Sequence, residues 1–205
     1  RHVGYKTDGV NDKFYKKGTE YANQVLNIDQ KYNFVNPKAG FSFHDNYHNA
    51  YVSVALSHRE PERNNYTDNG SYPAPVAESL TDYELGYSYI EPGMHFGLNL
   101  FYMGYKNQFV QTGAKSDIGE PLTTNIKDSY RMGMEMTIGC DLTSWLSIEA
   151  NMAMSSNKIK DFDEVVEDWD NGTRTIHYDN STLAFSPSLI SNTFINFHWK
   201  GLQAV

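Results

Sequence analysis

The chain has no long hydrophobic run, only one cysteine and no strongly basic stretch. No segment approaches the ~18 apolar residues of a membrane-spanning helix, although the strands of a membrane barrel need no such run. Cys140 alone cannot form an internal disulfide. With 17 Lys and Arg against 25 Asp and Glu, the chain lacks the clustered positive charge that binds a phosphate backbone. Nucleic acid is therefore not an expected partner.

Aromatic residues are abundant, with 15 Tyr and 11 Phe, which is typical of β-structure. The clearest strand runs from Tyr130 to Cys140, where even positions are apolar and odd positions are polar or small. Because successive strand side chains point to opposite faces, this strand has one apolar and one polar face. The same alternation predicts strands near 39–43, 51–57, 82–89, 96–103 and 146–155, and a poorer one over 189–198. We expect about eight strands, with a ninth beginning at Leu202, and only weak helical periodicity, over Tyr21–Gln30.

Short and long connections alternate along the chain. Short turns are expected near 44–49, 91–94, 141–144 and 199–201, and long polar loops near 59–79, 107–128 and 157–186, with a fourth polar stretch at 6–30. Short turns at one end, long loops at the other and alternating strands of ~10 residues between them are typical of an outer-membrane β-barrel. A soluble antiparallel β-sandwich also has one apolar and one polar face, and it is the alternative.

Three features favour the barrel. The connections are sorted by length, which a sandwich does not require. The polar faces carry charges in mid-strand, which a water-filled or plugged lumen accommodates: Glu84, Arg131, Glu135 and Glu149. Aromatic residues gather near the expected strand ends, as in the aromatic girdles of membrane proteins: Tyr83, Tyr89, Tyr102, Tyr130 and Trp145.

Several segments resemble those of TonB-dependent outer-membrane receptors, especially of the Bacteroidetes type. One is the NPKAGF run at 36–41, which opens a strand; others lie at 58–63, 80–87, 100–106, 128–135 and 184–187. The resemblance extends over 31–205, in order and with matching spacing. It implies an all-β, antiparallel, up-and-down transmembrane β-barrel of 22 strands, closed by an N-terminal plug domain. Residues 1–205 are then expected to be a partial wall of about 8–9 strands, with the plug domain and the closing strand outside this segment.

The resemblance also implies a function and partners. Members of the family take up scarce nutrients across the Gram-negative outer membrane, driven by the TonB complex. We expect an iron–siderophore complex as ligand, or haem or cobalamin, because that group is broad and the loops look shorter than those of glycan importers. Expected partners are outer-membrane lipid, the plug domain, the TonB complex and a small metal–chelate ligand. The alternative is a secreted, soluble β-sandwich module that binds glycans.

Two sets of residues are candidate site residues. Ligand contact at the outer mouth is expected from the long loops, because Arg pairs bidentately with carboxylates: Arg59, Glu60, Arg63, Tyr66, Gln108 and Asn125. The alternative is that these charges pair with one another. Glu84, Arg131, Glu135 and Glu149 are expected to face the plug, because a buried charge needs a partner. Pairing within the wall, for example of Arg131 with Glu149, is the alternative.

An acidic stretch lies in the last long loop: Asp161, Asp163, Glu164, Glu167, Asp168 and Asp170. Its spacing does not match a calcium-binding EF-hand, so we expect a solvated loop and no metal. The chain has no Ser/His/Asp order, no phosphate loop and no Cys/His cluster, and these motifs would mark common catalytic sites. Neither an enzyme nor a cofactor is expected.

Overall fold

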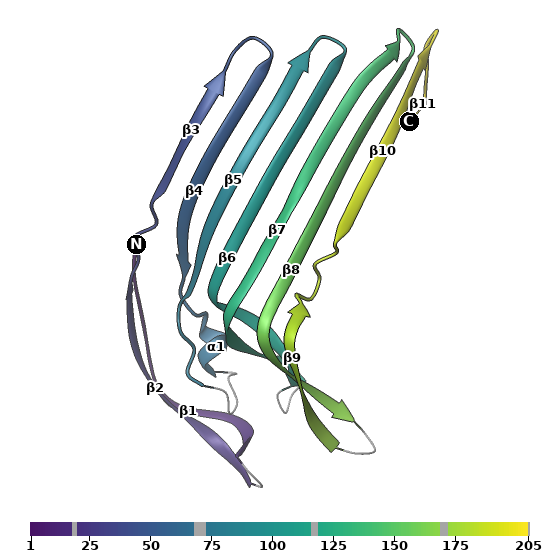
Figure 1. Ribbon diagram of the computed structural model, residues 1–205. Helices are drawn as coiled ribbons and strands as arrows, with labels where there is room; N and C mark the ends of the chain where they lie inside the picture. The colour runs from purple at the N-terminus through teal and green to yellow at the C-terminus, as the bar shows by residue number, and fades with distance from the viewer. Residues whose placement is uncertain (18–19, 68–72, 116–118, 169–171, 205) are drawn as a thin grey trace.

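The computed structural model describes residues 1–17, 20–67, 73–115, 119–168 and 172–204. Its main feature is a nine-stranded antiparallel sheet in the order β11-β10-β8-β7-β6-β5-β4-β3, with β9 paired to β8 (Figure 1). The strands are β3 (Lys38–His44), β4 (His48–Arg59), β5 (Glu78–Glu91), β6 (Met94–Lys115), β7 (Pro121–Thr143), β8 (Leu146–Asp168), β9 (Gly172–Thr182), β10 (Leu189–Trp199) and β11 (Leu202–Ala204). The expected all-β, up-and-down antiparallel wall is confirmed, including a last strand that begins at Leu202.

The short turns lie together at one end of the sheet, drawn at the top of Figure 1. They join β3 to β4, β5 to β6, β7 to β8 and β10 to β11. In the first turn the Asp45 carboxylate accepts the N–H groups of Tyr47 and His48, both at 2.9 Å. In the second, Gly93 has φ of +83°, a conformation that favours glycine. The four predicted turns are therefore confirmed.

Cross-strand pairing separates the two faces of the sheet. Residues that lie directly opposite each other in an antiparallel ladder share a face. One such row is apolar and crosses seven strands: Phe41, Val52, Leu85, Leu100, Met134, Met154 and Leu189. The adjacent row on the other face is mostly polar or small: Ser42, Tyr51, Gly86, Asn99, Glu135, Ala153 and Ile190. The predicted division into an apolar and a polar face is confirmed.

No described part of the chain covers the apolar face of the large sheet. Phe41 is 74% exposed and Leu85 52%, whereas a sandwich would bury this face against a second sheet. The other described sheet pairs β1 (His2–Lys17) with β2 (Glu20–Asn33), and it lies beyond the end of the large sheet (Figure 1). The structure therefore does not favour the β-sandwich alternative.

The prediction of long loops was wrong in detail. Residues 6–30 form most of the β1–β2 hairpin, so Tyr21–Gln30 is strand, not helix. The stretch 107–128 is largely the extended β6–β7 hairpin, and 157–186 contains the end of β8 and all of β9. Strands that project beyond an apolar layer lose the alternation by which periodicity detects them, although their backbone groups still need partners.

The stretch 59–79 contains the short helix α1 (Arg63–Thr67) and the start of β5. No helix among the described residues has the length and apolar character to cross a membrane. The buried hydrophobic cluster of the described residues lies at the long-hairpin end. It contains Ile126, Ile159, Phe162 and Leu183. This small core holds β7, β8 and the segment after β9 in fixed positions at the long-hairpin end.

Candidate functional site at the long-hairpin end

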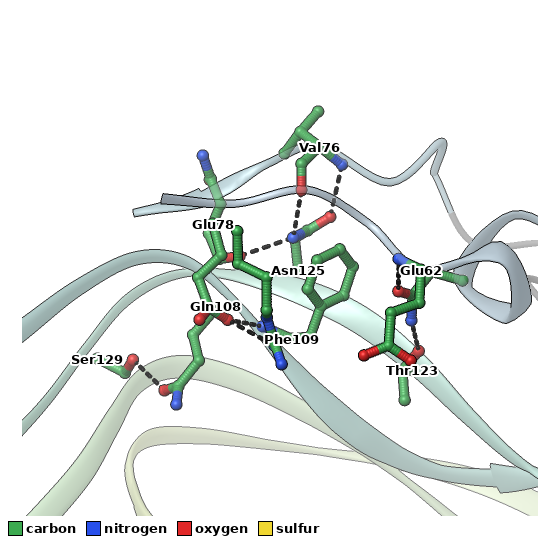
Figure 2. Close-up of polar contacts among 11 residues, drawn as sticks. Glu62, Val76, Glu78, Gln108, Phe109, Thr123, Asn125 and Ser129 are labelled. Atoms are coloured by element: carbon green, nitrogen blue, oxygen red, sulfur yellow. Dashed lines mark hydrogen bonds and ion pairs between the residues drawn. The ribbon is translucent and has the colours of Figure 1, made fainter. Parts of the chain in front are cut away.

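Glu78 is the centre of a polar network at the long-hairpin end of β4, β5 and β6. It lies where these strands leave the apolar band, the part of the sheet whose one face is lined by the apolar rows. Its carboxylate accepts a hydrogen bond from the Phe109 N–H at 2.9 Å. The same carboxylate forms an ion pair with the Arg59 guanidinium at 3.1 Å. The guanidinium also lies 5.7 Å from the centroid of the Phe109 ring. Figure 2 shows Glu78 reaching toward the backbone of Phe109. Glu78 is only 8% exposed, so these contacts supply the partners that a buried carboxylate needs.

Asn125 and Gln108 make further polar contacts beside Glu78 (Figure 2). The Asn125 amide donates to the carbonyls of Val76 at 3.0 Å and Asn107 at 2.7 Å, and its oxygen accepts the Val76 N–H at 2.9 Å. Gln108 is buried, and its side-chain oxygen accepts the Ser129 hydroxyl at 2.5 Å. Both amides therefore satisfy neighbouring groups of the wall, an arrangement that supports a scaffolding role.

Glu60 and Tyr66 hold the β1–β2 hairpin against the wall. Glu60 pairs with the side chain of Arg1. Tyr66 is 5% exposed, its ring stacks on Tyr5 with centroids 5.1 Å apart, and its hydroxyl lies 2.5 Å from that of Tyr32. Burial, followed by the bond to Tyr32, raises the pKa of the Tyr66 phenol, which therefore stays neutral. These contacts support anchoring, and ligand contact by Glu60 and Tyr66 stays a prediction.

Two of the six predicted ligand residues keep an exposed cation. Arg63 is exposed on α1, and the Arg59 side chain is 52% exposed despite its pair with Glu78. The helix is held by Asn65, whose side chain accepts the Glu62 N–H at 2.7 Å and donates to Thr123 at 3.0 Å. Ligand contact at the rim therefore stays a prediction. Among the six residues, Arg59 and Arg63 are the strongest candidates because their cations are exposed.

A hollow of about 400 Å³ lies between the ends of β6, β8 and β9. Aromatic and charged side chains share its lining: Phe109, Arg131, Phe162, Glu164 and Phe185. The Arg131 guanidinium donates to the Ser186 hydroxyl at 3.4 Å. Phe185 is 94% exposed, which is unusual for a large apolar side chain. The sequence did not single out these phenylalanines, because they lie in stretches expected to be loops.

Glu84, Arg131, Glu135 and Glu149 lie on the polar face of the sheet, as their cross-strand partners require. The suggested pairing of Arg131 with Glu149 is wrong. Arg131 is opposite Asn157, whereas Glu149 is opposite Gly139, eight residues farther along β7, or about 27 Å. Contact of these four charges with a plug domain stays a prediction.

The acidic stretch contributes to a cluster on the β8–β9 hairpin, not to a loop. His177 Nδ1 lies 2.8 Å from Asp163, and Nε2 lies 3.7 Å from Asp161 and 3.5 Å from Asp179. The hydrogen bond that His177 makes to the Asp163 carboxylate is the main cause that raises the pKa of His177. Among the described side chains, no group of three or more His, Cys, Asp or Glu is placed to hold a metal ion. Asp170 lies outside the described residues, as do the side chains of Glu167 and Asp168.

Comparison with known proteins gives a consistent result. A family model described as "TonB dependent receptor-like, beta-barrel" matches residues 1–204. No curated protein matches the chain. Among solved structures, the ferric-catecholate import receptor Fiu from K12 E. coli is 16% identical, with a TM-score of 0.59 over 96% of this chain and 28% of its own.

Two further structures have the same fold. The siderophore receptor PiuA from Acinetobacter baumannii is 14% identical, with a TM-score of 0.57 over 89% of this chain and 26% of its own. The copper transporter OprC is 13% identical, with a TM-score of 0.63 over 90% of this chain and 34% of its own. The chain thus spans about a third or less of the length of these structures, and identities this low establish the fold alone.

Proposed function

This chain belongs to the TonB-dependent receptor family of outer-membrane β-barrels, and from that premise we propose that it forms part of the wall of a nutrient importer. TonB-dependent receptors are transporters, not enzymes. The exposed apolar face then meets lipid, and the polar face lines the lumen. The short turns face the periplasm and the long hairpins face the exterior, as in other barrels of this class.

The hollow beside Arg131 is the observation that carries the ligand proposal. It lies at the outer end of the wall, and Arg131 is on the lumen face. A guanidinium binds carboxylate or other oxyanion groups by paired hydrogen bonds, and an exposed phenylalanine ring such as that of Phe185 can stack on a flat ligand group. This combination suits a small anionic metal chelate with aromatic or carboxylate arms. Ferric siderophores are such chelates, and haem also combines a flat ring system with carboxylates.

Two relatives in structure are named as ferric-catecholate and siderophore receptors, and a third is named as a copper transporter. We therefore propose an iron–siderophore complex as the first candidate ligand, with haem and cobalamin as further candidates. A plug domain and the TonB complex are the proposed partners. Four charges on the lumen face are the wall groups proposed to contact the plug: Glu84, Arg131, Glu135 and Glu149.

Uptake by cells tests the proposal. A bacterium that depends on the full-length receptor would be supplied with radiolabelled ferric catecholate, ferric hydroxamate or haem. We expect TonB-dependent accumulation of one of these ligands, and a loss of about tenfold or more for Arg131→Ala, since a charge-assisted bond contributes roughly 1.5–3 kcal/mol. Arg174→Ala, which removes an exposed arginine on β9, is the matched control. Equal uptake by a strain without the receptor would overturn the proposal.

A further inference from the structure

Lysines gather on the apolar side of the sheet where β6, β7 and β8 leave the apolar band. Lys106 lies opposite Asp128, and Asp128 lies opposite Lys160. Two residues along each strand, in the next row of the same face, Lys158 lies opposite Tyr130. Because direct cross-strand neighbours share a face, these three lysines point to the same side as Tyr130 and the apolar residues. We name Lys106, Lys158 and Lys160 the lysine patch.

Tyrosines of the same face lie beside the lysine patch, toward the short-turn end of the strands, and Tyr130 is level with Lys158. Tyr83 and Tyr102 are cross-strand neighbours with ring centroids 6.4 Å apart, and Tyr102 stacks on Tyr130 at 6.2 Å. Tyrosines in such a belt mark the level of the lipid headgroups. Lys106 is four residues beyond Tyr102 on β6, which is about 14 Å along a tilted strand. The flexible lysine stems can therefore place their ammonium groups at the headgroup level.

The charge of the patch contrasts with that of the chain. The whole chain has a net charge of −8. In the two cross-strand rows of β6, β7 and β8 that contain the lysine patch, Asp128 is nevertheless the one acidic residue. Asp128 pairs with Lys106, and this bond, with the positive charges of Lys127 and Lys160 nearby, lowers the pKa of its carboxyl.

Neither Lys158 nor Lys160 forms an ion pair with a carboxylate among the described residues, although Asp128 lies opposite Lys160. Lys158 donates to the Thr182 hydroxyl at 3.0 Å, and Lys160 is exposed. The next carboxylates along the hairpin, Asp161 and Asp179, lie within 3.7 Å of His177. An excess of positive charge therefore remains on the lipid-facing side.

We propose that the lysine patch binds the phosphate groups of a lipid headgroup in the outer leaflet. The proposal rests on the membrane orientation given under Proposed function. Lys106 and Lys160 are two strand spacings apart, or about 10 Å, so the two phosphates of a bisphosphorylated glycolipid can each reach an ammonium group. Basic residues on the outer surface of a membrane protein attract anionic headgroups in this way. The bound lipid would then stay at a fixed position beside β6–β8.

Native mass spectrometry of the full-length receptor in detergent tests this inference, with lipid A as the bisphosphorylated probe. For Lys158→Gln/Lys160→Gln we expect lipid A affinity to fall roughly 30-fold, about fivefold for each lysine near the surface. Lys158→Arg/Lys160→Arg keeps both charges and should keep the affinity. Dephosphorylated lipid A should bind weakly, and equally, to the native and Gln proteins.

The matched control is Lys38→Gln/Lys200→Gln, which removes the same charge from the polar face of β3 and from the turn between β10 and β11. We expect this control to bind lipid A as the native protein does. Equal losses in both double variants, or equal affinity for phosphorylated and dephosphorylated lipid, would overturn the lysine patch as a phosphate site. Ligand uptake is measured separately. An importer without this lipid site would take up ligand but bind lipid A weakly, whereas a barrel that binds lipid A without importing would show no uptake.

Discussion

The ring of Tyr51 lies directly over the backbone of Gly86 on the neighbouring strand, and its hydroxyl donates to Asn99 at 3.0 Å. A Cβ atom added at Gly86 would overlap this ring. The phenol thus crosses β5 to reach β6, and only glycine leaves room for it. This contact ties β4, β5 and β6 together on the lumen face.

Gly86→Ala is therefore expected to destabilise the barrel by about 1–3 kcal/mol, because overpacking displaces the Tyr51 ring and breaks its bond to Asn99. The temperature at which the full receptor loses its folded mobility in SDS gels would measure the effect. Gly4→Ala, where an added Cβ meets no atom within 4 Å, should change little. Tyr51→Ala/Gly86→Ala should be no less stable than Tyr51→Ala alone, and additive losses would contradict the steric explanation.

Arg59 and Arg63 should behave differently on substitution. Arg59→Ala leaves the Glu78 carboxylate buried without its cation, at a cost of about 1–3 kcal/mol, so the receptor should lose stability. Arg63 is exposed on α1, and Arg63→Ala should leave the unfolding temperature unchanged while weakening ligand binding. Calorimetry and ligand titration on the same two variants would separate the roles. A stability loss for Arg63→Ala equal to that for Arg59→Ala would show that both arginines are structural.

The membrane-level part of the wall could be predicted from the sequence because one physical rule governs it. With lipid on one side and the lumen on the other, Tyr130–Cys140 must alternate, and its cross-strand neighbours follow. The long-hairpin end obeys no such rule. Tyr66 looked like an exposed rim residue, but it is covered by Tyr5 and Tyr32 of the β1–β2 hairpin, a tertiary contact that local sequence does not encode.

The candidate site shows the same division. Its lumen-facing charge Arg131 was placed on the correct face by alternation. Its partner was not, because Ser186 is contributed by a segment far along the chain. Likewise, Phe185 and His177 lie in a stretch without periodicity. The folded β8–β9 hairpin places His177 beside its acidic neighbours, and the segment after β9 carries Phe185 to the hollow.

The β8–β9 hairpin should become less stable as pH rises through neutrality. In the folded chain the pKa of His177 is raised, chiefly by its bond to Asp163. A raised folded-state pKa means that the stabilisation is fully present below the unfolded pKa of about 6.5 and is lost as pH rises through the folded value. Hydrogen exchange of 158–168 and 172–182, corrected for its intrinsic pH dependence, should show this change. Asp163→Asn should reduce the change, since Asp161 and Asp179 still lie beside His177, and a pH dependence as large in Asp163→Asn as in the native protein would contradict the assignment.

Tyr66 should control how firmly the β1–β2 hairpin is held. Tyr66→Phe removes the bond to the Tyr32 hydroxyl and should weaken docking by about 1 kcal/mol. Tyr66→Ala also loses the stacked Tyr5 contact and the buried ring, for a cost of about 3–5 kcal/mol. Proteolysis within β1–β2 would then accelerate in the order native, Phe, Ala, while the membrane-level strands stay protected. Tyr47→Ala, at a partly exposed tyrosine in a short turn, should not change cleavage of the hairpin. Equal cleavage of native protein and Tyr66→Ala would mean that Glu60 and Arg1, not the aromatic stack, hold the hairpin in place.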